Sequence, residues 1–283
     1  MPQQMPSNSL RSLAKTAMLI IALGAGFTPQ QRLFSQKETS EAARVLLEKY
    51  KGALVVVTAE SKVVTTTDGD PLPTKTQQRR TLGTTVFPNG LIVCSNSALD
   101  ASVGLVQQKV RVNDKDGKQQ VVTVASAKSE FSKVEISYGD AIVLPGKVVA
   151  QRPEIDLAFV LPDAGAAKKL GKEFTAVDLS KFATMAKTAD EVVGLSRASA
   201  VYEYMPTIIM GHITGIFKGD RTYYVTTAGT AQGIPVFTLD GSPIGVTLER
   251  IVDGQRSGIL GTLSAGSIQV MANLAMEKAT PGK

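Results

Sequence analysis

The sequence has no tryptophan, one cysteine and one histidine among its 283 residues, and these shortages exclude several kinds of site. A lone thiol cannot form an internal disulfide, so packing must stabilise the fold. Cys94 ends an apolar run and is expected to be a buried, unreactive side chain. Zinc sites need clusters of Cys and His, and Cys94 and His212 are far apart in the chain, so we expect no metal. His212 itself lies in a predicted strand, where a half-buried, hydrogen-bonded imidazole is expected rather than a catalytic one.

The sequence also lacks the charge runs and loop motifs of several ligand-binding classes. The formal net charge is +6, and Lys or Arg residues are adjacent only at 79–80 and 168–169, which indicates a mildly basic solvated surface rather than a nucleic-acid site. Residues 114–117 look like the start of a calcium loop, but no Glu follows at the required spacing. Residues 229–233 lack the Lys of a phosphate-binding loop. We therefore expect no cofactor, no metal and no nucleic acid.

The N-terminal residues have the pattern of an export signal. Arg11 and Lys15 precede an apolar run at 16–27 that ends in small residues, as in a secretory signal peptide. The run is short for a bilayer span, which needs roughly 20 residues. We predict a leader at 1–26 that is cleaved near Ala25, and hence a periplasmic or secreted protein. An uncleaved membrane anchor is the alternative, and it would be the only contact with the membrane.

The remaining sequence is typical of a mainly β protein. Runs rich in β-branched residues at 54–57, 121–124 and 142–144 suit half-buried strands. Turn sequences separate the predicted strands at 68–71, 88–90, 114–117 and 138–140. This pattern fits a barrel or a sandwich up to about residue 161, and a second strand-rich block covers 192–263.

Helices are expected at both ends of this β region. The first is predicted from Thr39 or Ser40, as the N-cap, to about Lys51, and the second from Ser267 to Lys278. The apolar face predicted for the first helix consists of residues at helical spacing, namely Ala42, Val45, Leu46 and Lys49 or Tyr50.

Three segments resemble a known family when they are read in order. The stretch LGTTVFPNGLIVCSNSAL at 82–99 looks like the first-barrel signature of trypsin-like serine proteases and is nearest to that of the bacterial periplasmic HtrA-type enzymes. The stretch EIDLAFV at 154–160 resembles the strand that bears the family's catalytic Asp, and 211–246 follows the order of its nucleophile loop and hairpin. The resemblance covers roughly 52–275.

The resemblance implies a fold and a division of the chain. The fold class would be mainly β, with two six-stranded antiparallel β-barrels and helices at the N- and C-terminal ends. The predicted parts are a signal peptide (1–26), an N-terminal segment with a helix (27–51), the first barrel (52–163), a linker with a helical turn or two (164–190), the second barrel (191–265) and a C-terminal helix and tail (266–283).

The same resemblance fails at the positions that carry the chemistry. The family's mechanism needs a nucleophilic hydroxyl, an imidazole base and a carboxylate that orients the base. Matched to the family pattern, the imidazole position is Ser97 and the carboxylate is Asp156. The nucleophile position, counted back from Pro235, is Gln232, or Ala231 if one residue is inserted. A Ser hydroxyl is not basic near neutral pH, so we expect Asp156 to be hydrogen-bonded to Ser97 or to nearby backbone N–H groups as a structural remnant.

The oxyanion-hole turn is altered as well. Thr230 and Ala231 occupy the former turn, and Thr230 replaces a Gly whose conformational freedom helps to aim a backbone N–H. The sequence therefore predicts a catalytically inactive protease homologue of the cell envelope or periplasm that binds a peptide or protein partner or serves as a scaffold. The alternative is an active serine-type endopeptidase with a displaced catalytic group. The resemblance leaves room for an oligomer without requiring one.

Overall fold

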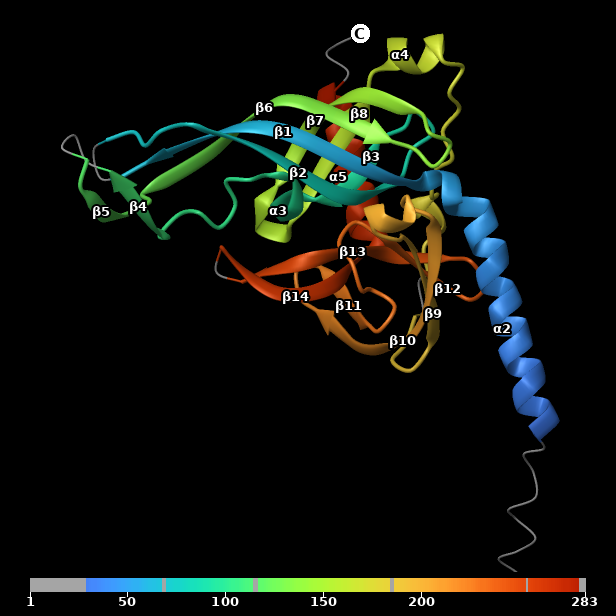
Figure 1. Cartoon of the computed structure of the whole chain (residues 1–283). Helices are drawn as coiled ribbons and strands as arrows, with labels where there is room; N and C mark the ends of the chain where they lie inside the picture. The colour runs from blue at the N-terminus through green and yellow to red at the C-terminus, as the bar shows by residue number, and fades with distance from the viewer. Residues whose placement is uncertain (1–28, 68–69, 114–116, 184–185, 253, 280–283) are drawn as a thin grey trace, which may run out of the picture. The chain divides into compact units, whose positions relative to one another are not determined.

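Two closed six-stranded antiparallel β-barrels make up most of the fold (Figure 1), which confirms the predicted fold class. The computed structural model describes residues 29–67, 70–113, 117–183, 186–252 and 254–279. The predicted leader at 1–26 lies outside these ranges, as do parts of the predicted turns at 68–71 and 114–117.

The first barrel is closed in the order β1-β2-β3-β8-β7-β6. The β-branched runs predicted at 54–57 and 142–144 fall in β1 and β7, whereas the run at 121–124 falls outside the barrel. Alternate side chains of these strands fill the interior, as in Val55 and Val57 of β1, which are fully buried. The strands are β1 (Leu54–Thr66), β2 (Lys75–Thr85), β3 (Ile92–Ser95), β6 (Ser126–Ser137), β7 (Val143–Arg152) and β8 (Leu157–Pro162).

The second barrel repeats the topology of the first. Its order is β10-β11-β14-β13-β12-β9, so in both barrels the third strand along the chain pairs with the sixth and the fourth pairs with the first. The strands are β9 (Glu191–Arg197), β10 (Pro206–Lys218), β11 (Thr222–Thr226), β12 (Pro235–Thr238), β13 (Pro243–Val252) and β14 (Gln255–Ser264).

The connections between these strands carry short helices and one extra hairpin. The hairpin, formed by β4 and β5, is inserted between β3 and β6 and lies beyond the barrel, at the far ends of β1 and β6 (Figure 1). The predicted linker contains the helical turns expected of it. The bounds are β4 (Lys109–Asn113), β5 (Gln119–Thr123), α3 (Asn96–Leu99), α4 (Ala164–Lys169), η1 (Lys51–Ala53), η2 (Pro153–Ile155), η3 (Leu179–Lys181) and η4 (Ala200–Tyr202).

The N-terminal helix α2 (Pro29–Tyr50) begins earlier than the sequence predicts. Thr39 and Ser40, expected at the N-cap, lie inside it, because Pro29 suits a first helical position and the Gln, Lys and Glu residues that follow are good helix formers. The predicted apolar face is also wrong in part. Val45 is 58% exposed, and the buried residues are Ala43, Leu46 and Tyr50. The ring of Tyr50 stacks on that of Phe237 in β12, at a centroid distance of 5.0 Å.

The C-terminal helix α5 (Ala265–Ala279) confirms the helix predicted at 267–278. Its buried side chains, Ile268, Ala272 and Ala275, face the protein, and the helix contacts β13 of the second barrel and β7 of the first. The helix therefore covers both barrels. Among the described helices, none is both long and apolar enough to cross a bilayer.

Backbone contacts tie the second barrel directly to the first. Arg197, at the end of β9, is 8% exposed, and its guanidinium donates to the carbonyl oxygens of Leu54 (2.7 Å) and Lys51 (3.1 Å) at the start of β1. Burial lowers the pKa of this guanidinium, and the charge of Asp140 opposes that shift. A side chain of the second barrel thus binds two backbone carbonyls where the chain passes from η1 into β1.

Gly233 makes the second such contact. Its N–H donates to the carbonyl of Thr247 (2.7 Å) and its carbonyl accepts from the Thr84 hydroxyl (2.8 Å), while its φ of +81° lies in the left-handed region. A Cβ at this position would lie 2.0 Å from the carbonyl oxygen of Leu82 in β2. Only glycine therefore allows the two barrels to approach this closely.

We expect the substitution Gly233→Ala to lower the free energy of unfolding by several times the loss caused by Gly171→Ala. Gly171 also has a positive φ, of 59°, but a Cβ there would meet no atom within 4 Å, so its substitution should cost only the conformational strain of about 1–2 kcal/mol. Chemical denaturation of both variants measures the difference. Equal losses would show that the approach to Leu82 is not a tight contact.

Candidate functional site

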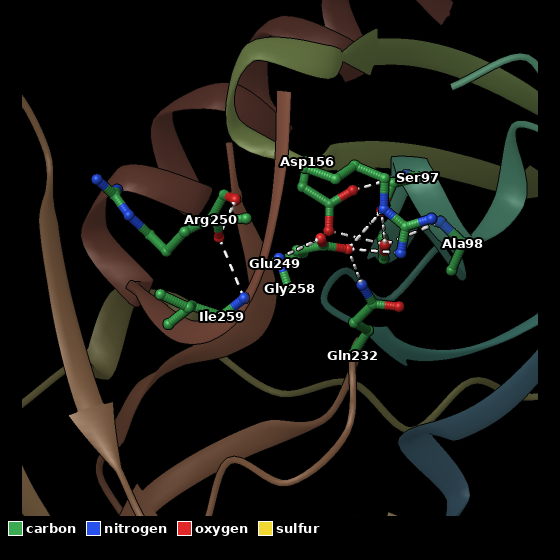
Figure 2. A network of polar contacts seen from close by, with 11 residues as sticks. Ser97, Ala98, Asp156, Gln232, Glu249, Arg250, Gly258 and Ile259 are labelled. Atoms are coloured by element: carbon green, nitrogen blue, oxygen red, sulfur yellow. Dashed lines mark hydrogen bonds and ion pairs between the residues drawn. The ribbon is translucent and has the colours of Figure 1, made fainter. Parts of the chain in front are cut away.

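The structure brings Ser97, Asp156 and Gln232 to one place between the barrels, as Figure 2 shows. Ser97 lies in the single-turn helix α3, directly after β3. This turn forms because Ser95 is its N-cap, with the Ser95 hydroxyl accepting from the N–H of Ala98 (3.1 Å). Ser97 is buried in this turn, with 5% of its surface exposed.

Asp156 follows η2 in a left-handed conformation, with φ 59° and ψ 32°, and it is fully buried. Its Oδ1 accepts from the N–H of Ser97 (2.6 Å), and its Oδ2 accepts from the Ser95 hydroxyl (2.8 Å) and from the N–H of Glu249 (2.8 Å). The sequence predicts hydrogen bonds from Ser97 or from nearby backbone N–H groups, and the structure contains both kinds. Burial raises the pKa of Asp156, and the donors that converge on the carboxylate oppose this shift.

The carboxylate of Glu249, which sequence reasoning missed, is the centre of the site. Glu249 lies on β13 with its side chain 3% exposed. Its Oε2 accepts from Gln232 Nε2 (3.0 Å), from the Ser97 hydroxyl (3.4 Å) and from both Nε (2.9 Å) and Nη2 (2.7 Å) of Arg256. Its Oε1 accepts from the N–H of Gly258 (2.9 Å). The side chains of Ser97 and Gln232, the positions predicted for the base and the nucleophile, are thus both bound to one carboxylate.

The Glu249 carboxylate is a weak base in this setting. Burial raises its pKa, but the hydrogen bonds from Arg256 and Gly258 and the charge of Arg256 outweigh burial, so the net effect is a lowered pKa. The same ion pair raises the pKa of Arg256. Glu249 is therefore ionised at neutral pH, and its oxygens are already engaged by donors. It is a carboxylate beside Gln232 that is poorly placed to accept a proton from an attacking hydroxyl.

The turn at residues 230–233, where the resemblance places the nucleophile, lies close to the first barrel, because the carbonyl of Gly233 accepts from the Thr84 hydroxyl. Gln232 lies in a turn before β12 and is partly buried, whereas Thr230 is exposed and Ala231 is partly buried. Neither Gln232 nor Ala231 has a hydroxyl, so the position expected for a nucleophile has none under either alignment. Gln232 instead donates its amide to Glu249 (3.0 Å).

The single histidine and the single cysteine take no part in this network. His212 is exposed on β10 rather than half-buried as predicted, because its side chain alternates outward between buried Gly211 and Ile213. Its backbone N–H donates to the Thr227 hydroxyl (2.9 Å). Cys94 is fully buried in β3, as predicted, and burial followed by the nearby charge of Asp156 raises the pKa of its thiol, which keeps it protonated and unreactive.

One feature of the sequence could have drawn attention to Glu249. Residues 243–252 alternate as a strand should, and Thr247 and Glu249 put polar side chains on one face where the neighbouring positions are apolar. Arg256, seven positions later, returns on the adjacent strand because β13 and β14 form a hairpin in which Ile251 pairs with Arg256. An acidic residue inside a buried strand followed by Arg across a hairpin indicates a buried ion pair.

The described residues contain no group of three or more His, Cys, Asp or Glu side chains that could hold a metal ion. No protein-family model matches the chain, and no curated protein shows a significant similarity to it. The fold and the contacts described above are therefore the basis for interpreting the site.

We expect Glu249→Gln to destabilise the protein by about 1–3 kcal/mol, because a buried carboxylate that binds a guanidinium is replaced by a neutral amide. The matched control is Glu135→Gln, which removes the carboxylate from a more solvent-accessible ion pair with Lys133 on the same strand (3.0 Å) and should cost less than about 1 kcal/mol. Chemical denaturation at pH 7 measures both losses.

The loss caused by Glu249→Gln should also depend on pH. The folded-state pKa of Glu249 is lower than its unfolded value, so its stabilising contribution is complete above the ordinary pKa of about 4.3 and disappears as the pH falls through the lowered folded value. The difference in unfolding free energy between the two proteins should therefore shrink on acidification. A difference that grows at low pH would contradict the assigned ion pair.

We expect Asp156→Asn to destabilise the protein by about 1–3 kcal/mol even though it removes a buried charge. Both carboxylate oxygens accept from a backbone N–H, of Ser97 or of Glu249, so either orientation of the amide places an NH₂ group against a donor. Asp163→Asn is the control, because Asp163 caps α4 through one acceptor contact with Ala166 (2.6 Å) and Asn caps helices equally well. Thermal unfolding should show a clear loss of stability for Asp156→Asn and little or no loss for Asp163→Asn.

Proposed function

We propose that the chain is a catalytically inactive homologue of the trypsin-like serine proteases, nearest to the HtrA-type enzymes, and that it binds a peptide or protein partner in the cell envelope or periplasm. The two closed barrels with one shared topology are consistent with the chymotrypsin-like fold of that family. The ordered sequence motifs at 82–99, 154–160 and 211–246 support the relationship, and the predicted leader supports the location.

The observation that carries the proposal is the position of the Glu249 carboxylate. It binds the side chains of Ser97 and Gln232 at once and is neutralised by Arg256. A protease needs a base at the first of these positions and a hydroxyl at the second. Here the first position has a weak donor, the second has an amide, and the space between them holds an ionised carboxylate with a lowered pKa.

A two-barrel protease fold can keep a peptide-binding role after the chemistry is lost. Such folds bind extended peptides by adding a strand to an exposed sheet edge, and the backbone hydrogen bonds of that mode need no catalytic side chain. Binding without turnover is therefore the role that remains for the fold once the proton-transfer groups have gone.

We expect the purified chain to leave unfolded casein intact and to remain unlabelled by a fluorophosphonate probe, with an active trypsin-like protease as the positive control. The alternative is an endopeptidase with a displaced catalytic group, and Ser95→Ala and Ser97→Ala test the two hydroxyls that contact carboxylates at the candidate site. Labelling that either substitution abolishes would overturn the proposal.

A further inference from the structure

A large groove lies at the end of the first barrel, between the outer part of the β1–β2 pair and the β4–β5 hairpin. Its volume is about 1010 Å³. Apolar side chains from both sides line it, among them Val63 of β1, Leu72 of the β1–β2 connection, and Val110, Val112 and Val122 of the hairpin. We call this the hairpin groove. It is distinct from the Glu249 site, and ligand sites typically enclose about 300–1,000 Å³.

The hairpin that forms one wall of the groove has an amphipathic pattern. Val110 and Val112 are partly buried, while Lys109, Arg111 and Asn113 between and beside them are exposed. Val122 pairs with Val110 across the hairpin, which places these valines on the same face. A two-stranded sheet of this size is marginally stable without a partner for its apolar face. The valines that line the groove therefore form a surface suited to further apolar side chains.

The strands of the hairpin also have unused edges. Within the described residues, β4 pairs only with β5 and β5 only with β4, so each has one edge without a neighbouring strand. The base of the hairpin is fixed to the barrel, because the N–H of Ala125 donates to the carbonyl of Thr66 (2.8 Å). An extended peptide can thus add to an edge of a sheet that is anchored at its base.

The charged side chains around the groove favour an acidic ligand. Two cationic residues, Lys75 and Arg111, line it, and in the described part of the chain neither forms an ion pair. Asp70 is the one acidic residue among the described residues that line the groove. Arg binds carboxylates through paired N–H donors, so Arg111 is suited to a carboxylate on the ligand.

We infer that the hairpin groove binds an extended peptide segment that alternates apolar side chains with carboxylate side chains and adds as a third strand to the β4–β5 hairpin. The apolar side chains would contact Val110, Val112 and Val122, and the carboxylates would pair with Lys75 and Arg111. The inference rests on the proposed function and deepens it, because it places the partner's binding surface at the hairpin rather than between the barrels.

The direct test uses two labelled peptides and fluorescence anisotropy. The first has the repeated pattern Val-Glu-Val-Thr, and the second replaces each Glu with Lys. We expect the acidic peptide to bind at least tenfold more tightly than the basic one, and its affinity to fall as salt is raised, because the pairs are exposed at the rim. Equal affinities, or no binding of the acidic peptide, would overturn the inference.

Two variants locate the binding. Lys75→Glu combined with Arg111→Glu should weaken binding of the acidic peptide at least tenfold, whereas Lys147→Glu, at an exposed position on β7, should leave it unchanged. Circular dichroism checks that each variant is folded. Hydrogen exchange gives an independent readout, since an added strand should protect amides in 109–113 or 119–123. Protection elsewhere, or an equal loss in the Lys147 variant, would contradict the assignment.

Failure of the inference and failure of the proposed function are distinguishable. Binding of the acidic peptide should persist in Glu249→Gln, because the hairpin groove does not include that residue. If the unmodified protein neither binds the acidic peptide nor hydrolyses casein, the inferred peptide binding at the hairpin groove is rejected and the proposed function is not. Fluorophosphonate labelling would reject the inactive-homologue proposal whether or not the groove binds peptide.

Discussion

The buried carboxylate of Asp156 is the constraint on which the rest of the site depends. It accepts from Ser95 and Ser97 of the first barrel and from the backbone of Glu249 in the second, so three donors from distant parts of the chain converge on one group. Because unpaired donors in a dry interior are costly, these contacts fix where α3 and β13 lie. The side chain of Glu249, on the same strand, contacts Ser97 and Gln232. The Asp156 carboxylate thus holds backbone of both barrels in place.

The sequence predicted the architecture well because strand patterns and turns are local signals. The β-branched run at 54–57 and the turn at 88–90 lie where expected, and the helix near 267–278 differs only at its ends. The resemblance to trypsin-like proteases also led to the prediction that Asp156 lies beside Ser97, and the two residues are in contact. The N-terminal helix was placed less well. Thr39 and Ser40 are good caps by type, but Pro29 and the helix formers after it set an earlier start.

Glu249 could not be predicted from the motifs that resemble the protease family, because it matches none of the three positions those motifs point to. Its role depends on the register of the β13–β14 hairpin, which brings Arg256 within 2.7 Å, and on the approach of a strand from the other barrel. Such contacts join residues that are distant in sequence, and strand periodicity says which face a side chain occupies but not what it meets there. His212 was misjudged for a related reason, since its exposure depends on the phase of one strand.

Arg197 contacts the carbonyls of Lys51 and Leu54, and Gly233 contacts Thr84; these contacts have a consequence for how the protein unfolds. Each barrel supplies hydrogen-bond donors to backbone carbonyls of the other. Separating the barrels would leave the Arg197 guanidinium and these carbonyls without their partners, which is costly. The two halves should then melt in a single cooperative transition, and neither should persist as a folded fragment once the chain between them is cut and the pieces are parted.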